Sequence, residues 1–249
     1  MSASSGGGGN ETAMAREDLA AALRLAARFG LHEGICNHFS YMVPGSDERF
    51  LINPYGLHWS QIRPQDLVVV DASGKLLEGE GEVEATAFSI HLAVHMNSPR
   101  ARCVLHTHMP HATALTCLAD GRLEPIHQNS LRFMGRIAYD DTYEGLATDL
   151  TEGDRIARAM GGADIGFLAH HGVIVAGETV ARAFDDLYYL ERAAEVQVLA
   201  YSTGRPLRHV PAPVVARTAQ QFAAEALQAH KHFEALKRVL DQDSPGWRA

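Results

Sequence analysis

The sequence predicts a single α/β domain built around a mixed, largely antiparallel sheet. Short apolar runs typical of buried strands alternate with longer segments in which apolar residues recur at helical spacing. Several early runs are joined by turns short enough for hairpins, which favours antiparallel pairing over a fully parallel sheet. With 249 residues, 46% of them hydrophobic, and no internal repeat or change of composition, the chain can bury the core of one large domain.

The chain is expected to begin with a tail and then a helix. Residues 1–12 are rich in serine and glycine, so they are expected to be disordered, and the single domain is expected over residues 13–249. Small apolar residues recur at helical spacing from about residue 14 to 29, and Gly30 is placed to end that helix.

The remaining elements follow from apolar periodicity and turn residues. Strands are expected over residues 38–42, 49–52, 67–70, 75–77, 102–107, 165–169 and 173–176, with a hairpin turn at 71–74. Helices are expected over residues 86–96, 111–117, 153–160, 179–202 and 214–240.

Charge and composition exclude several classes of protein. A net charge of -8 and a pI of about 5.9 argue against a surface for nucleic acid or anionic membranes. No apolar run approaches the roughly 18 residues of a membrane span, and no secretory signal is visible. Three cysteines without a CxxC pair fit a reducing compartment. We therefore expect a cytoplasmic protein that acts on a small molecule.

Two histidine clusters each end an apolar, strand-like run. His106 and His108 are two residues apart, so a strand would present both imidazoles on one face. The second run ends in His170-His171-Gly172. A third histidine from this cluster would complete a three-nitrogen site with an open position, the arrangement of catalytic rather than structural zinc sites.

Other polar residues allow two interpretations each. His91 and His95 lie one helical turn apart and could bind metal, but without a third ligand nearby we expect them to pack against the sheet. Asn37 and Ser40 lie in and after a small polar loop, which could hold a substrate anion or serve only as a turn. Tyr143 could donate a proton or lie on the surface.

Together these residues resemble the class II aldolase/adducin family, from about residue 19 to 205. The matching motifs are Asn37-x-x-Ser40, Ile52-Asn53-Pro54-Tyr55-Gly56, Asp71 to Gly74, Phe88-Ser89-Ile90-His91, His106-Thr107-His108-x-x-His111 and His170-His171-Gly172. The resemblance implies an α/β/α sandwich, usually a homotetramer with active sites between subunits. It also implies one divalent metal ion per subunit, zinc first and manganese or iron as alternatives, held by His106, His108 and His171.

The chain departs from the sugar-phosphate aldolases that it resembles. Those enzymes carry Ser-Ser-Glu shortly before the histidine matching His91, whereas this chain has Ala-Thr-Ala, which leaves Ala87 at the glutamate position. Thr86 replaces the serine pair and remains a candidate substrate-binding residue together with Asn37 and Ser40. Because a phosphate dianion needs several convergent donors, we expect a non-phosphorylated carboxylate substrate.

The resulting prediction is a metal-dependent carbon–carbon lyase, a decarboxylase or aldolase that acts on a small hydroxy, oxo or aromatic carboxylic acid through a metal-stabilised enolate. Glu84, three residues before the vacant glutamate position, is the candidate acid/base, and Tyr143 is the candidate proton donor. Three alternatives stay open: a sugar-phosphate aldolase or dehydratase, a non-haem iron oxygenase, and a non-catalytic adducin-like interaction module.

Overall fold

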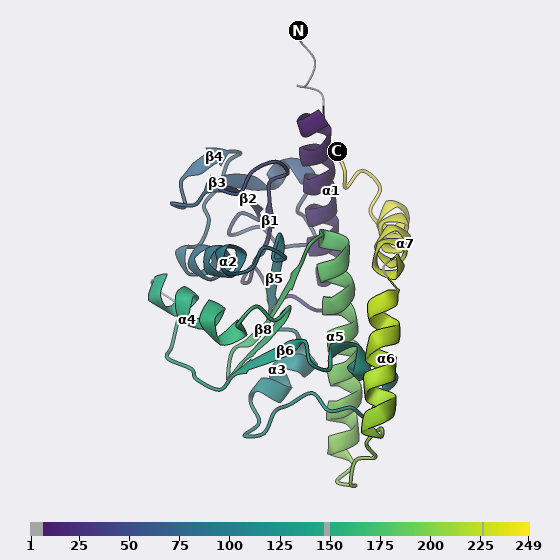
Figure 1. Cartoon of the computed structure of the whole chain (residues 1–249). Helices are drawn as coiled ribbons and strands as arrows, with labels where there is room; N and C mark the ends of the chain where they lie inside the picture. Colours follow the sequence, from purple (N-terminus) through teal and green to yellow (C-terminus); the bar gives the residue numbers. More distant parts are fainter. Residues whose placement is uncertain (1–6, 147–149, 226) are drawn as a thin grey trace.

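One eight-stranded sheet with helices on both faces forms the computed structural model, which describes residues 7–146, 150–225 and 227–249 (Figure 1). The strands are β1 (Phe39–Met42), β2 (Arg49–Ile52), β3 (Val68–Asp71), β4 (Leu76–Glu78), β5 (Cys103–Thr107), β6 (Ile137–Asp140), β7 (Ile165–Leu168) and β8 (Gly172–Gly177). They lie in the order β4-β3-β2-β1-β5-β8-β7-β6, and each neighbouring pair is antiparallel except β6 with β7. This confirms the predicted α/β/α sandwich around a mixed, largely antiparallel sheet.

The helices divide between the two faces of this sheet. They are α1 (Gly7–Arg28), α2 (Ala85–Asn97), α3 (Pro110–Thr116), α4 (Leu150–Met160), α5 (Val180–Ser202), α6 (Ala212–Ala224) and α7 (Gln228–Asp243), with short 3-10 turns η1 (Pro64–Asp66) and η2 (Gln128–Phe133). Apolar side chains of α1, α3, α5 and α7 share one core with the sheet, whereas α2 and α4 cover the opposite face. None of the described helices is both long and apolar enough to cross a membrane.

Strand β5 lies in the middle of the sheet, and all five of its residues are buried. Cys103 and Leu105 belong to the core beneath α1 and α5, whereas Val104 belongs to the core beneath α2 and α4. Because side chains alternate along a strand, His106 points to the same face as Val104. The end of β5 pairs with the start of β8, Thr107 opposite Val173, so the turn between β7 and β8 lies beside the residues that follow β5.

Helix α1 begins earlier than the sequence suggests. It starts at Gly7, so residues 7–12 are helical rather than part of a disordered tail. The apolar residues from Ala15 onward anchor this helix in the core, and each residue added to an existing helix gains a hydrogen bond without a new nucleation cost. The first part of the expected tail, residues 1–6, lies outside the described residues.

The single C-terminal helix predicted over residues 214–240 is wrong, because the chain forms two helices there. Helix α6 ends at Ala224, and Glu225 leaves the helical conformation with φ -86 and ψ 59. Helix α7 buries Ala229, Phe233 and Leu240 and packs against α5 and α1, whereas α6 packs against η2. One straight helix could not reach both docking surfaces, which explains the break.

Strand β6 was not expected from the sequence. Its four residues, Ile-Ala-Tyr-Asp, are mostly half-buried at the edge of the sheet and pair in parallel with β7. They have little of the continuous apolar character that identifies a central strand. Only the tertiary pairing with β7 reveals this segment as a strand.

Candidate metal centre

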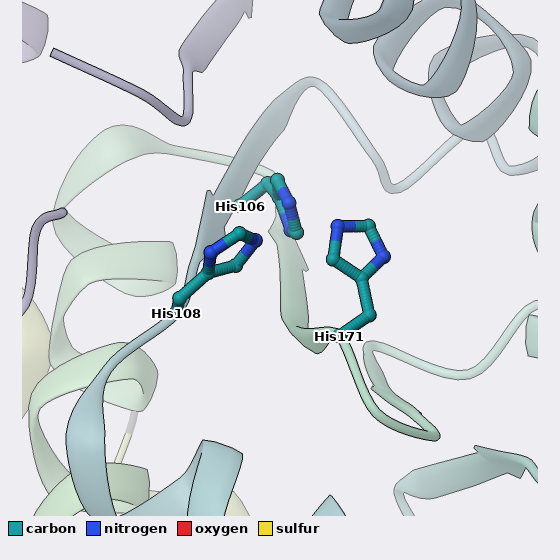
Figure 2. A group of neighbouring side chains, drawn as sticks. All are labelled: His106, His108 and His171. Carbon is teal, nitrogen blue, oxygen red and sulfur yellow. The ribbon is translucent and has the colours of Figure 1, made fainter. Parts of the chain in front are cut away.

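Three imidazoles converge where β5 meets the β7–β8 turn (Figure 2). His106 belongs to β5, His108 follows it, and His171 lies in the turn. One ring nitrogen from each residue lies within 4.8 Å of the others, and the ring centroids are 4.8 to 5.1 Å apart. Among the described residues, no other histidine, cysteine or carboxylate joins this group. The two neighbouring strands thus bring together the three residues that the family resemblance nominates.

Two of the three rings are held by hydrogen bonds on their far side. His106 Nδ1 lies 3.0 Å from the carbonyl oxygen of Val173, and His108 Nδ1 contacts the carboxylate of Glu33. Both partners only accept, so Nδ1 carries the proton in each ring and Nε2 keeps its lone pair. His108 Nε2 is buried and has no hydrogen-bond partner in the part of the chain that the structure describes. A cation would satisfy this nitrogen, and histidine ligands of metals are held in this manner.

The backbone of the β7–β8 turn excludes His170 from the group. His170 has φ 57, a conformation uncommon for a residue with a side chain, and its ring centroid lies 6.3 Å from that of Tyr143. Next to it, a Cβ added to Gly172 would come within 2.6 Å of the Thr107 carbonyl oxygen and 2.7 Å of His108 Cδ2. Only glycine therefore lets the turn approach closely enough for His171 to face the other two rings.

Burial keeps His106 and His171 uncharged. Desolvation, followed by repulsion from the neighbouring histidines, moves the pKa of His106 well below its ordinary value. Desolvation and repulsion from His108 lower the pKa of His171 to about 4, against an opposing attraction from Glu152. Both imidazoles are therefore neutral at pH 7, which is the form that ligates a cation.

Two of the predicted substrate-binding residues, Asn37 and Ser40, are both buried but contact different histidines. Asn37 is buried beside the group, with φ 70, and its Oδ1 accepts a 3.4 Å hydrogen bond from the backbone N–H of His108. Ser40 is also buried, but its Oγ lies 2.6 Å from His91 Nδ1 and 2.7 Å from His95 Nε2. The Ser40 hydroxyl therefore already has two imidazole partners in a buried cluster, and its role in substrate binding stays a prediction.

The placement of His91 and His95 agrees with packing against the sheet, since both are buried on α2 against Ser40 of β1. His95 is also fixed through Nδ1, which lies 2.5 Å from the carbonyl oxygen of Ala101. In the same helix, Thr86 lies in the first turn, and its side chain lies outside the described residues.

Neither predicted acid/base residue is a member of the histidine group. Glu84 directly precedes the first residue of α2 and is half-buried. Tyr143 follows β6 and is 47% exposed, and its nearest described aromatic neighbour is His170. Tyr143 thus lies on the solvent side of the turn that carries His171.

Sequence analysis missed two carboxylates near the group. Glu33 lies in the bend before Asn37 and contacts His108 across a separation of 75 residues. Glu152 of α4 is close enough to His171 to affect its pKa, and Arg155 holds its carboxylate through two 2.7 Å hydrogen bonds. No local pattern identifies either residue, because only the fold brings them to the histidines.

Comparison with known proteins gives one family match. The model of the family described as "Class II Aldolase and Adducin N-terminal domain" matches residues 17–198. A solved structure, of an aldolase II superfamily protein from Pseudomonas syringae, superposes with a TM-score of 0.90 at 36% identity and covers 96% of both chains.

Two curated relatives come from Streptomyces. The "Decarboxylase NovR" of Streptomyces niveus is 31% identical over 226 residues, which cover 90% of this chain and 83% of the relative. The "4-hydroxy-3-prenylphenylpyruvate oxygenase/4-hydroxy-3-prenylbenzoate synthase" of Streptomyces roseochromogenus is 31% identical over 210 residues, covering 84% and 75%. The matches therefore include relatives named for decarboxylation and for oxygenation.

Proposed function

The chain belongs to the class II aldolase and adducin family, and on this premise we propose that it is a divalent-metal-dependent carbon–carbon lyase. The substrate is a small, non-phosphorylated hydroxy, oxo or aromatic carboxylic acid. Decarboxylation is the leading reaction and aldol cleavage the alternative within the same class.

The observation that carries this proposal is the convergence of three imidazoles with two of their Nδ1 atoms anchored. His106, His108 and His171 would hold the ion, with zinc first and manganese or iron as alternatives. When bound, such an ion polarises a substrate oxygen and stabilises the negative charge left by the breaking carbon–carbon bond. The protein fixes the ligands: Val173 and Glu33 orient two rings, and Gly172 allows the third to approach.

The substrate class is supported by the sequence of the first turn of α2, by Asn37 and by the relatives. Ala87 stands at the aldolase glutamate position, and Thr86 alone replaces the serine pair that binds phosphate. Both differences argue against a phosphorylated substrate. Both Streptomyces relatives have names that refer to decarboxylation or to an aromatic acid. Asn37, buried beside His108, would orient a substrate carboxylate through its amide.

Acid/base chemistry is assigned to residues outside the histidine group. Tyr143, near His170, would donate the proton that replaces the lost carbon group. Glu84 would act as the displaced acid/base, and Glu152 is a further carboxylate in electrostatic contact with His171. Arg155 holds the Glu152 carboxylate through two 2.7 Å hydrogen bonds.

We also propose a cytoplasmic homo-oligomer, with a tetramer as the arrangement that the family resemblance implies. His108 and His171 are both partly exposed, so a neighbouring copy could close the open side of the site. Helix α6 has no buried residue within one chain, and Leu199 and Leu227 are 57% and 67% exposed. All three cysteines are free, as expected in a reducing compartment.

The second candidate is a non-haem iron oxygenase, favoured by the relative named as a phenylpyruvate oxygenase. Iron(II) accepts imidazole ligands and leaves open positions for substrate and oxygen. The two reactions differ in a measurable way, because only oxygenation consumes oxygen.

One experiment separates these possibilities. Metal-free protein is loaded with zinc, manganese or iron(II) and given aromatic and aliphatic oxo and hydroxy acids, while carbon dioxide release and oxygen uptake are recorded together. The proposal expects carbon dioxide release without oxygen uptake, and loss of this activity in His171→Ala. Coupled oxygen uptake would replace the lyase by the oxygenase, and cleavage of phosphorylated ketoses alone would favour a sugar-phosphate aldolase. A protein that binds no metal and releases no product would be an adducin-like interaction module.

A further inference from the structure

A second polar site lies at the opposite end of β7 from the histidine group. A cavity of about 250 Å³ opens between η2, the start of α5 and α6, and three of the described residues that line it are Arg132, Arg136 and Arg182. No acidic residue is among those that line it. Arg136 accepts a backbone hydrogen bond from Ile165 at the start of β7. At about 3.3 Å per residue, the six residues to His171 place this cavity roughly 15–20 Å from the histidine group.

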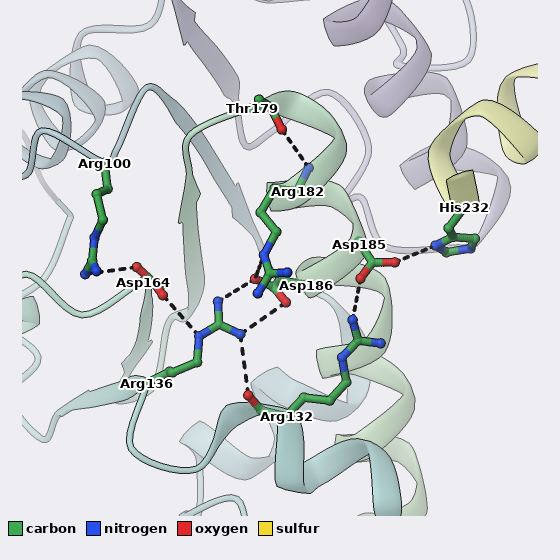
Figure 3. A network of polar contacts seen from close by, with 9 residues as sticks. All are labelled: Arg100, Arg132, Arg136, Asp164, Thr179, Arg182, Asp185, Asp186 and His232. Atoms are coloured by element: carbon green, nitrogen blue, oxygen red, sulfur yellow. Dashed lines mark hydrogen bonds and ion pairs between the residues drawn. The ribbon is translucent and has the colours of Figure 1, made fainter. Parts of the chain in front are cut away.

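Arg132 is the central residue of this cavity. Its side chain is only 5% exposed, and its guanidinium lies 4.1 Å from the ring centroid of Tyr189 and 5.1 Å from that of Phe222. Nη2 donates to Asp185, but Nη1 is buried and has no hydrogen-bond partner among the described residues (Figure 3). Leaving a buried charged donor without an acceptor costs free energy. The rings of Tyr189 and Phe222 therefore hold Arg132 Nη1 in a position where an added acceptor would remove this cost.

The other two arginines differ in how far their donors are used. Arg136 donates to Asp164, Asp186 and the carbonyl oxygen of Arg132, so it supplies charge but few free donors. Arg182 approaches Asp186 through Nε at 3.3 Å. Among the described residues, none forms a hydrogen bond with the terminal nitrogens of Arg182. Arg182 is 34% exposed, which leaves these donors accessible from the cavity.

The acids that neutralise these arginines lie behind them rather than in the cavity. Asp185 is shared between Arg132 and His232, whose Nδ1 is 2.8 Å away, and Asp186 is shared between Arg136 and Arg182. The arginine donors that remain therefore face a space without competing carboxylates. This space adjoins a larger cavity of about 710 Å³ that Arg136, Arg182 and Ala223 also line, which offers room for an organic group. The larger cavity, unlike the smaller one, is also lined by the acidic residues Asp18, Asp164 and Glu178.

We propose that this cavity, the arginine pocket, binds a small oxyanion, the phosphate or carboxylate group of a metabolite. Arg132 Nη1 and the terminal nitrogens of Arg182 donate to the anion, and Arg136 adds positive charge. Charge-assisted hydrogen bonds from guanidinium groups are well suited to both anions. The site is separate from the histidine group and does not depend on its metal.

The test is a calorimetric titration of metal-loaded protein with inorganic phosphate and, in a second arm, with malonate. Saturable binding of at least one anion is expected, and the stronger arm identifies phosphate or carboxylate as the preferred group. Arg182→Gln should weaken that binding about tenfold, because it removes charge-assisted donors. Arg132→Ala would leave Asp185 without its guanidinium partner and destabilise the fold. Arg182 is therefore the position to change. If Arg182→Gln does not fold, Arg182→Lys replaces it in the titration.

Two controls make the result decisive. Arg217 lies on α6 but does not line the pocket, so Arg217→Gln should bind the anion as the wild type does. His171→Ala should also bind it normally, because an anion held by the metal centre would be lost in this variant. No saturable binding of either anion, equal weakening by Arg217→Gln, or loss in His171→Ala would each overturn the proposal.

Discussion

The Nδ1 atom of His108 donates a hydrogen bond to the carboxylate of Glu33, although 75 residues separate them in the chain. His108 is largely buried, whereas the Glu33 side chain is 63% exposed. The carboxylate fixes both the tautomer and the orientation of the ring, and it makes Nε2 a stronger ligand. Glu33 is therefore the residue through which the loop before β1 acts on the candidate metal centre.

Replacing Glu33 should weaken metal binding without unfolding the protein. In Glu33→Ala, we expect the affinity for zinc to fall about 10- to 100-fold, the range found when such partners of histidine ligands are removed. Stability should change by less than about 0.5 kcal/mol, because the side chain is exposed. Competition with a chromophoric chelator measures the affinity, and Glu80→Ala, an exposed acid elsewhere, is the control. Equal affinities for both variants and the wild type would show that Glu33 has no influence on the site.

Gly172→Ala should disturb the same site by crowding it. The new methyl group would meet the Thr107 carbonyl oxygen and the His108 ring at less than 3 Å, so the turn or the ring must move. We expect a loss of about 1–3 kcal/mol of stability, typical of overpacking, together with weaker metal binding. The matched control is Gly166→Ala in the adjacent strand, where the methyl group meets only the flexible Met160 side chain. If both variants bind metal equally well, close approach at Gly172 does not shape the site.

The buried histidines predict an acid-sensitive fold. Burial lowers the pKa values of His38 and His95 to about 4, so between pH 4 and 6.5 the unfolded chain binds more protons than the folded one. Stability is therefore complete above pH 6.5 and is lost as the pH falls toward 4. Each of these residues should cost about 2 kcal/mol between pH 7 and pH 5.

Urea unfolding of metal-free protein at a series of pH values measures this dependence. In His95→Asn, where the shorter amide can still donate to the Ala101 carbonyl oxygen that His95 contacts, the slope with pH should become shallower. A free energy of unfolding that does not change between pH 7 and pH 5 would contradict the burial of these residues as neutral imidazoles.

Much of the fold could be predicted from local patterns. Apolar runs located β1, β2 and β5 because these strands are buried and their ends are marked by polar residues. Strand β6 was not predicted, because an edge strand of half-buried residues lacks a clear apolar run between polar ends. The break between α6 and α7 was not predicted either, since helical periodicity continues through Glu225. The break arises only because the two helices pack against different parts of the protein.

The candidate site shows the same division. The histidine spacing and the family motif nominated the three rings that the fold brings together. The contacts of Ser40 could not be predicted, because the sequence does not reveal that two imidazoles of α2 bind its hydroxyl. Glu33 could not be found, because its contact depends on the path of a loop far from His108 in the chain.

The central claim is that His106, His108 and His171 hold one divalent ion, and metal content is its most direct measure. Wild-type protein, freed of metal and reloaded with zinc, should contain about one ion per chain by elemental analysis, and each of the three His→Ala variants should contain almost none. The control is His170→Asn, because asparagine tolerates the backbone conformation that His170 adopts at φ 57, and it should keep the full complement. Circular dichroism must show that all four variants are folded. Metal retained in folded His171→Ala, or lost in His170→Asn, would contradict the assignment.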